Sequence, residues 1–290
     1  MWEKIYVNGC SFSDGYGLDI PEYLEVLNKY NPKYPIHTES KETLNNFRKN
    51  NSWPGVLESL INIPIVNEAS FGGSFERVIR MSFDYISKQS NPSDTLFIFD
   101  IPNSERHDWW SVSDDTFKKV THISGKPNNP VIHQNGELFN PSEVDTIQKF
   151  YKFFGDDKRK WLDELRSLIF FCSFLKSKNI DFIIIPTEQL LYAREITDLK
   201  RWERELEFID EHVIRFKVPQ KFTYSYLCVE HQKINVDYTE NPLVFYQDYH
   251  KQTFKDETNG ELDDTHPNLE GCRLMAHQIY ENIKNKYIKV

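Results

Sequence analysis

The amino-acid sequence predicts an α/β fold in which a parallel sheet is covered by helices on both faces. Short apolar runs rich in β-branched residues alternate with segments whose apolar residues recur at helical spacing. The chain has 290 residues, of which 39% are hydrophobic, so it can bury a substantial core. We expect a single domain over residues 1–290.

Five segments have the composition of buried strands bounded by turn residues. The predicted strands span residues 4–7, 63–67, 95–101, 181–186 and 243–246. Between them, apolar residues at intervals of three and four indicate helices. The predicted helices span residues 53–61, 74–88, 158–178, 190–213 and 268–287. This alternation is typical of a parallel sheet built from βαβ units.

Two long segments do not fit the alternation. Residues 104–141 are polar and rich in turn residues, with Trp109 and Trp110 near their start, and residues 218–241 carry several tyrosines. Long insertions between core elements commonly serve as lids or binding loops. We therefore expect these two segments to select the substrate.

Charge and cysteine spacing exclude several classes of function. The formal net charge is −9 and no block of Lys and Arg is long enough to follow a phosphate backbone, so nucleic acid is not an expected partner. No apolar run approaches the length of a membrane span, and the first residues lead into a strand, so we expect a soluble, cytoplasmic protein. The four cysteines are far apart, which favours free thiols over a zinc site and gives no sign of a cofactor. The sequence does not indicate an oligomeric state.

The first candidate for chemistry is Ser11, which follows the first predicted strand in a glycine-rich turn. Groups at the carboxyl ends of parallel strands gather at one edge of a sheet, where loops and helix N-termini meet. A serine in such a turn can be an exposed nucleophile, but it can equally be a turn residue or a helix cap. Cys10 is a rival nucleophile beside it.

Two further turns follow predicted strands. Gly72 lies in a Gly-Gly-Ser segment before a helix, where a backbone N–H can stabilise negative charge, although the segment also reads as a plain loop with an N-cap. Asn103 follows the third strand, and its carboxamide can donate to an oxyanion or simply close a turn.

A second reactive pair lies near the other end of the chain. Asp263 precedes His266 by three residues, so the turn before the last helix can bring the carboxylate to one imidazole nitrogen while the other faces a serine. Asp263, Asp264 and His266 are also possible metal ligands. However, no second pair of His and carboxylate residues has ligand spacing, so we expect no metal.

These residues resemble the blocks of the SGNH hydrolase family, also called GDSL-like esterases and lipases. Residues 9–17, Gly-Cys-Ser-Phe-Ser-Asp-Gly-Tyr-Gly, are similar to the first block, with Cys10 in place of its Asp and Ser13 in place of its Thr. Asn67 followed by Gly72 is similar to the second block.

The remaining blocks match unequally. The third, Gly-x-Asn-Asp, is matched only by Asn103, since Ile101 and Ser104 replace its glycine and aspartate, so Ser104 or Arg106 is an alternative donor. The last block is matched well by Asp263, His266 and Pro267, followed by the small residues Gly271 and Ala276. The four blocks occur in the family's order over nearly the whole chain.

The resemblance implies a flavodoxin-like three-layer α/β/α fold and ester hydrolysis without a cofactor or metal. It also implies a triad of Ser11, His266 and Asp263, and an oxyanion hole formed by the Ser11 N–H, the Gly72 N–H and the Asn103 carboxamide. A small-molecule ester or a carbohydrate ester is the expected substrate, because Trp109 and Trp110 can stack on sugar rings. The competing interpretation is that the two tryptophans only pack locally. The alternatives are an acyltransferase with the same triad and a non-catalytic binding protein on the same scaffold.

Overall fold

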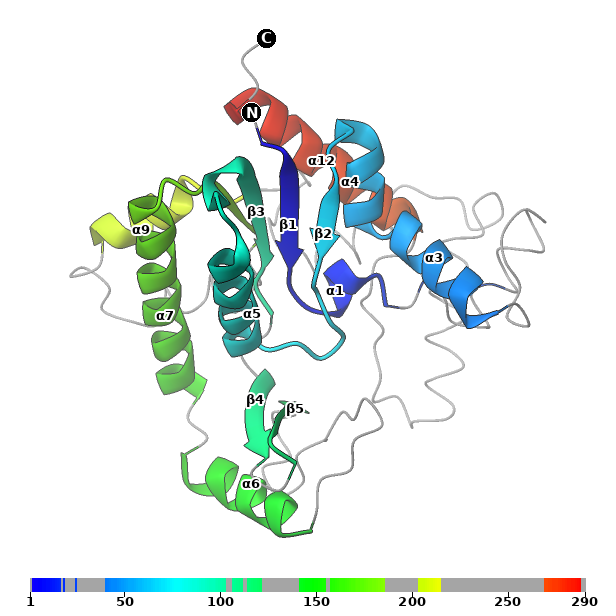
Figure 1. The fold of residues 1–290 in the computed structure, drawn as a ribbon. Helices are drawn as coiled ribbons and strands as arrows, with labels where there is room; N and C mark the ends of the chain where they lie inside the picture. The colour runs from blue at the N-terminus through cyan, green and yellow to red at the C-terminus, as the bar shows by residue number, and fades with distance from the viewer. Residues whose placement is uncertain are drawn as a thin grey trace, which may run out of the picture. The chain divides into compact units, whose positions relative to one another are not determined.

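The computed structural model describes residues 2–16, 18, 24, 40–102, 106–111, 114–121, 141–154, 157–185, 203–214 and 269–287 (Figure 1). The chain forms two compact units, the first from residues 1–10 and 68–213 and the second from residues 11–67 and 214–290. The single domain expected from the sequence remains a prediction.

A parallel sheet supplies the edge at which the candidate site lies. Strands β1 (Lys4–Asn8), β3 (Thr95–Asp100) and β6 (Phe182–Ile185) pair in parallel, with Asn8 opposite Phe99 and Asp100 opposite Ile185. With β2 (Ile65–Asn67) the strand order is β2-β1-β3-β6. Because crossovers are right-handed, the change of direction at β1 gives a doubly wound sheet with helices on both sides, as predicted.

The strands form where the sequence is continuously apolar. All six residues of β3 and all four of β6 are buried, as is β1 from Ile5 onward. A strand covered on both faces needs an apolar run rather than an alternating pattern. The buried polar residues fall at the strand ends, with Asn8 and Asp100 as the last residues of β1 and β3 and Thr95 as the first residue of β3.

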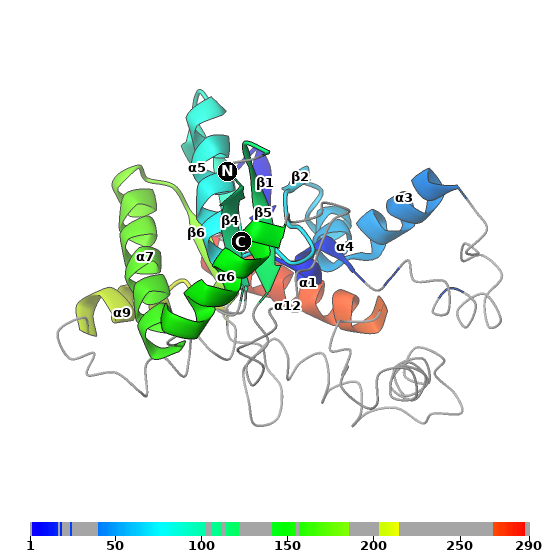
Figure 2. The ribbon, with the colours of Figure 1, turned by 90° about the horizontal axis from the view of Figure 1, so that it is seen from below.

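In the first unit, α5 (Phe75–Lys88) and α7 (Asp157–Ser177) lie side by side (Figures 1 and 2). Their contact is aromatic, since the ring of Phe83 lies 5.3 Å from that of Phe171 and 4.8 Å from that of Phe174. Phe171 also contacts Phe99 of β3 at 5.1 Å. The two helices therefore cover the same face of the sheet. A short 3-10 helix, η1 (Pro92–Asp94), precedes β3, and α9 (Glu203–Asp210) packs against α7.

The second unit contains α1 (Ser11–Asp14), α3 (Lys41–Asn51), α4 (Trp53–Ile61) and α12 (Leu269–Tyr287). Helix α12 packs against α4 through residues buried at helical spacing. These residues are Leu269, Cys272, Met275, Ala276, Ile279 and Ile283. No helix in the described ranges is long and apolar enough to cross a membrane.

The insertion predicted as irregular contains regular structure instead. Strands β4 (Arg106–Ser111) and β5 (Thr116–Thr121) form an antiparallel hairpin, and α6 (Pro141–Phe154) follows. The hairpin was missed because its strands are rich in charged residues. Its aromatic and β-branched residues still favour pairing, with Trp110 opposite Phe117. The second insertion, 218–241, lies outside the described residues.

Most of the predicted elements are confirmed. The four strands before residue 190 are present, and the helices predicted at 53–61, 74–88, 158–178 and 268–287 correspond to α4, α5, α7 and α12. Of the helix predicted at 190–213, the described part contains α9 and a turn. The strand predicted at 243–246 falls outside the described residues.

Candidate active site

The turn after β1 holds the candidate nucleophile. Ser11 is the first residue of α1, directly after Gly9 and Cys10, and all three residues are buried. The Tyr16 N–H donates to the Ser11 carbonyl at 3.0 Å, which closes the short helix. The sequence therefore places Ser11 at the carboxyl end of a central strand, as predicted for a group at this edge of the sheet.

Asp100, which sequence reasoning missed, lies beneath this turn. Its carboxyl is 1% exposed at the end of β3, and the Cys10 Sγ donates to its Oδ2 at 3.7 Å. A Cβ on Gly9 would lie 2.6 Å from the Asp100 Cβ, so only glycine fits there. An acidic residue ending an otherwise apolar strand was the available signal.

The loop that carries Gly72 is bonded to the β1 turn. The Glu68 N–H donates to the Val7 carbonyl at 2.9 Å, and the Ser70 N–H donates to the Gly9 carbonyl at 3.3 Å. Gly72 is buried with φ of 68°, a left-handed conformation that favours glycine. The backbone hydrogen bonds thus hold this loop against Gly9.

Asn67, the polar residue of the second sequence block, supports the segment that begins at Ser11. Its Nδ2 donates to the Ser13 carbonyl at 2.8 Å. The Trp53 Nε1 donates to the Ser13 Oγ at 3.1 Å, with Trp53 and Ser13 both fully buried. Two long-range donors therefore fix α1, which has too few residues to be stable by itself.

The other predicted site residues lie outside the described residues. These are Asn103, Asp263 and His266, together with the alternative donor Ser104 and the alternative metal ligand Asp264. Pro102 is the last described residue after β3, and α12 begins at Leu269, three residues after His266. The triad and the carboxamide donor remain predictions. Within the described ranges no group of His, Cys, Asp and Glu residues could hold a metal ion.

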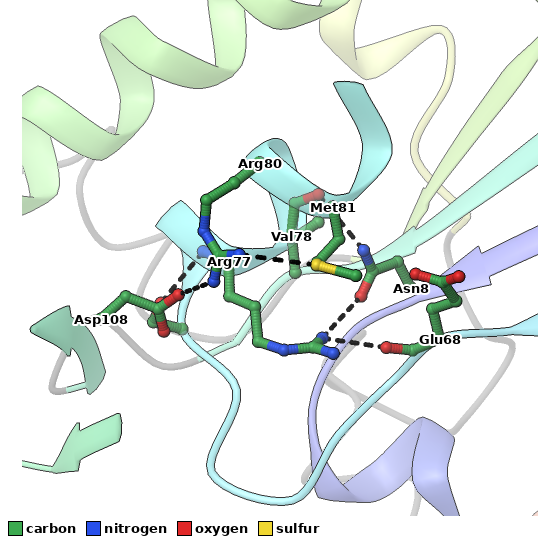
Figure 3. A network of polar contacts seen from close by, with 8 residues as sticks. Asn8, Glu68, Arg77, Val78, Arg80, Met81 and Asp108 are labelled. Carbon is green, nitrogen blue, oxygen red and sulfur yellow. Dashed lines mark hydrogen bonds and ion pairs between the residues drawn. The ribbon is translucent and has the colours of Figure 1, made fainter. Parts of the chain in front are cut away.

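The N-terminal part of α5 is bonded to strand β4 of the hairpin (Figure 3). Ser74 caps the helix by accepting from the Arg77 N–H at 3.1 Å, and its Oγ donates to the Asp108 Oδ1 of β4 at 2.9 Å. The Arg80 Nη2 contacts the Asp108 Oδ2 at 2.5 Å, and the Asp108 side chain is 3% exposed. The hairpin is therefore anchored to α5 by a buried carboxylate.

Trp109 and Trp110, for which the sequence left both sugar stacking and local packing open, make local contacts within the first unit. The ring of Trp109 makes an edge contact with Phe150 of α6 at 5.8 Å, and that of Trp110 contacts Phe117 at 4.8 Å. Trp110 and Phe117 remain 45% and 40% exposed. Trp109 thus has a packing role, while part of Trp110 stays accessible.

The two remaining described cysteines are buried and unreactive. Burial raises the pKa of Cys172 far above its ordinary value, and it raises the pKa of Cys272 to about 12. A thiol that stays protonated is a weak nucleophile and a weak metal ligand. The prediction of free thiols is confirmed for Cys10, Cys172 and Cys272.

Comparisons with known proteins give structural likenesses only. No family model matches the chain, and no curated protein matches it. A member of the G-D-S-L lipolytic family from Veillonella parvula is 14% identical, covers 99% of both chains and has a TM-score of 0.42. The psychrotrophic esterase EstA from Pseudoalteromonas sp. is 12% identical, with 98% of this chain and 97% of that chain covered and a TM-score of 0.43.

A carbohydrate esterase is similar at 11% identity, with 98% of this chain and 65% of that chain covered and a TM-score of 0.44. The first of these three structures is a lipolytic protein and the other two are esterases. At such identities and TM-scores, their activities do not transfer to this chain.

Proposed function

We propose that this chain is a serine hydrolase that cleaves a carboxylic ester through Ser11. The observation that carries the proposal is the hydrogen bond from the Ser70 N–H to the Gly9 carbonyl. It joins the loop that contains the candidate donor Gly72 to the turn that leads directly into Ser11. An oxyanion hole needs its donors fixed before reaction, and such a bond supplies that rigidity.

In the proposed mechanism, His266 removes the Ser11 proton as Oγ attacks the acyl carbon, and Asp263 orients the imidazole. The oxyanion of the tetrahedral intermediate accepts hydrogen bonds from the Ser11 N–H, the Gly72 N–H and the Asn103 carboxamide. Collapse breaks the ester C–O bond, and the alcohol leaves with the proton held by His266. Water then attacks the acyl-enzyme by the same steps and releases the acid.

The Ser11→Ala variant tests this proposal. Hydrolysis of p-nitrophenyl esters of increasing acyl length should fall by up to about six orders of magnitude, because the nucleophile is lost. Ser87→Ala, which changes an exposed serine of α5, is the matched control and should keep the wild-type rate. Equal rates in wild type and Ser11→Ala would reject the proposal.

A fluorophosphonate provides a second readout. Attack by an activated Oγ on phosphorus expels fluoride and leaves a covalent adduct, which peptide mass spectrometry should locate at Ser11. Cys10→Ala should be labelled like the wild type, because Cys10 is not the proposed nucleophile. An adduct at Cys10, or at neither residue, would contradict the assignment.

The non-catalytic alternative is favoured by one observation, the complete burial of Ser11. A binding protein on this scaffold would hold a ligand without turnover and without labelling. The same two measurements separate it from the hydrolase. An acyltransferase would also be labelled at Ser11 but would form new esters when a competing alcohol is added.

A further inference from the structure

A network of polar contacts lies at the end of β1 (Figure 3). Asn8, the last residue of β1, is 0% exposed. Its Nδ2 donates to the Tyr6 Oη at 3.0 Å and to the Val78 carbonyl at 3.2 Å. Its Oδ1 accepts from the Gly9 N–H at 2.9 Å and from the Arg77 Nη1 at 3.3 Å.

These contacts use the whole hydrogen-bonding capacity of the Asn8 amide, which has two N–H donors and two acceptor lone pairs. They also fix its orientation. A reversed amide would set its NH₂ group against two other donors, the Gly9 N–H and the Arg77 guanidinium. Asn8 therefore holds the Gly9 N–H in one place, directly before the turn that leads to Ser11.

Arg77 extends the network to the neighbouring loop. Its Nη1 carries two hydrogens, and the second acceptor of this nitrogen is the Glu68 carbonyl at 2.9 Å. Burial lowers the pKa of Arg77 while Asp108 opposes that change, and a guanidinium keeps its charge under such conditions. One nitrogen thus joins the end of β1 to the start of the loop that contains Gly72.

We propose that Asn8 and Arg77 are positioning residues for the ester hydrolysis. This inference rests on the proposed function. Asn8 and Ser70 fix the N–H and the carbonyl of Gly9, and Arg77 fixes the first residue of the Gly72 loop. The pair sets where the loop that contains Gly72 lies relative to Gly9, and neither residue needs to touch the substrate.

The physical consequence is a specific kinetic defect. A misplacement of about 1 Å at a reacting group can cost about 100-fold in rate, because stabilisation of the oxyanion depends on donor geometry. Substrate binding in the ground state depends much less on that geometry. Loss of Arg77 should therefore lower kcat and leave KM nearly unchanged.

Three variants test the inference with p-nitrophenyl acetate. Arg77→Met removes the guanidinium donors, Arg77→Lys keeps the charge without the planar fork, and Arg166→Met is a control that removes an exposed arginine of α7 paired with Asp163. Rates are divided by the number of sites titrated with fluorophosphonate. A merely structural role would reduce the number of titratable sites and leave the rate of each site intact.

We expect Arg77→Met to lower kcat per titrated site about 100-fold with KM within about threefold. Arg77→Lys should recover part of the loss, and Arg166→Met should match the wild type. A kcat per site within twofold of wild type in Arg77→Met overturns the inference. If Arg77→Met does not fold, Arg77→Lys becomes the deciding variant. A tenfold fall in its kcat per titrated site supports the inference, and a wild-type kcat per site overturns the inference.

The proposed function and this inference fail differently. A wild type that neither hydrolyses the ester nor is labelled at Ser11 rejects both. A wild type whose activity is abolished in Ser11→Ala but intact per site in Arg77→Met rejects only the positioning role.

Discussion

At the residue scale, two glycines of the candidate site, Gly9 and Gly73, lie close together. A Cβ on Gly73 would lie 2.9 Å from the Gly9 carbonyl and equally close to the Ser70 carbonyl. Both obstacles are backbone atoms, which cannot turn aside as a side chain can. The absence of a side chain at position 73 therefore lets the loop lie against the β1 turn.

We predict that Gly73→Ala lowers the free energy of unfolding by about 1–3 kcal/mol, because the new methyl group must displace backbone. Urea denaturation would measure the change, with Ser90→Ala in an exposed loop as the control. The variant should also lose esterase activity, since the loop carries Gly72. An unfolding free energy within about 0.5 kcal/mol of wild type would show that the loop has room to adjust.

At the element scale, α5 connects the hairpin to the turn that precedes Ser11. The hydroxyl of its N-cap residue Ser74 donates a hydrogen bond to Asp108 of β4. The guanidinium of Arg77, in its first turn, donates a hydrogen bond to Asn8 of β1. A helix end with unpaired N–H groups needs such partners when it is buried. The sequence predicted Ser74 as the N-cap of this helix. It did not predict the hydrogen bond between Ser74 and Asp108.

Two serine caps in this chain allow a matched comparison. Ser74 and Ser40 each accept from the N–H three residues later, but Ser74 is buried and Ser40 is exposed. Ser40→Ala should cost about 0.5–1 kcal/mol of unfolding free energy, as a cap does. Ser74→Ala should cost about 1–3 kcal/mol, because it also leaves a buried carboxylate oxygen without its donor. Equal losses in urea denaturation would mean that the contact with Asp108 contributes nothing.

At the scale of the whole molecule, stability should depend on the protonation of Glu164 in α7. Burial raises the pKa of Glu164 to about 7, with Lys160 opposing and Glu76 adding to the rise. The Lys160 Nζ lies 3.5 Å from the Glu164 Oε1, and the carboxyl is 13% exposed. Between its ordinary pKa and about 7, the folded state binds more protons than the unfolded state.

The unfolding free energy should therefore fall as the pH rises through this interval, and it should level off above it. Glu164→Gln removes the titration, so we expect the variant to be more stable than wild type by about 1–3 kcal/mol at about pH 8 and nearly equal at about pH 5. Urea denaturation across that range measures this, with the exposed Glu207→Gln as the control. A difference that does not change with pH would contradict the prediction.

Much of the fold could be predicted from local patterns because burial leaves a mark in the sequence. The strands buried on both faces appear as continuous apolar runs, and the helices α4, α5, α7 and α12 appear as apolar residues at helical spacing. Helix α3 was missed because it has no buried residue, so nothing in its sequence marks an apolar face. The hairpin was missed because its charged residues masked the strand pattern.

The sequence by itself determined the parallel sheet, the turn that holds Ser11 and the loop that holds Gly72, since glycine, serine and apolar runs act over a few residues. The tertiary structure decided that Asp100 lies under that turn, that Asn8 and Arg77 join it to the loop, and that Asp108 anchors the hairpin. These contacts link residues 90, 69 and 34 positions apart. Partners so distant along the chain leave no local pattern, because they meet only when the strands and α5 pack together.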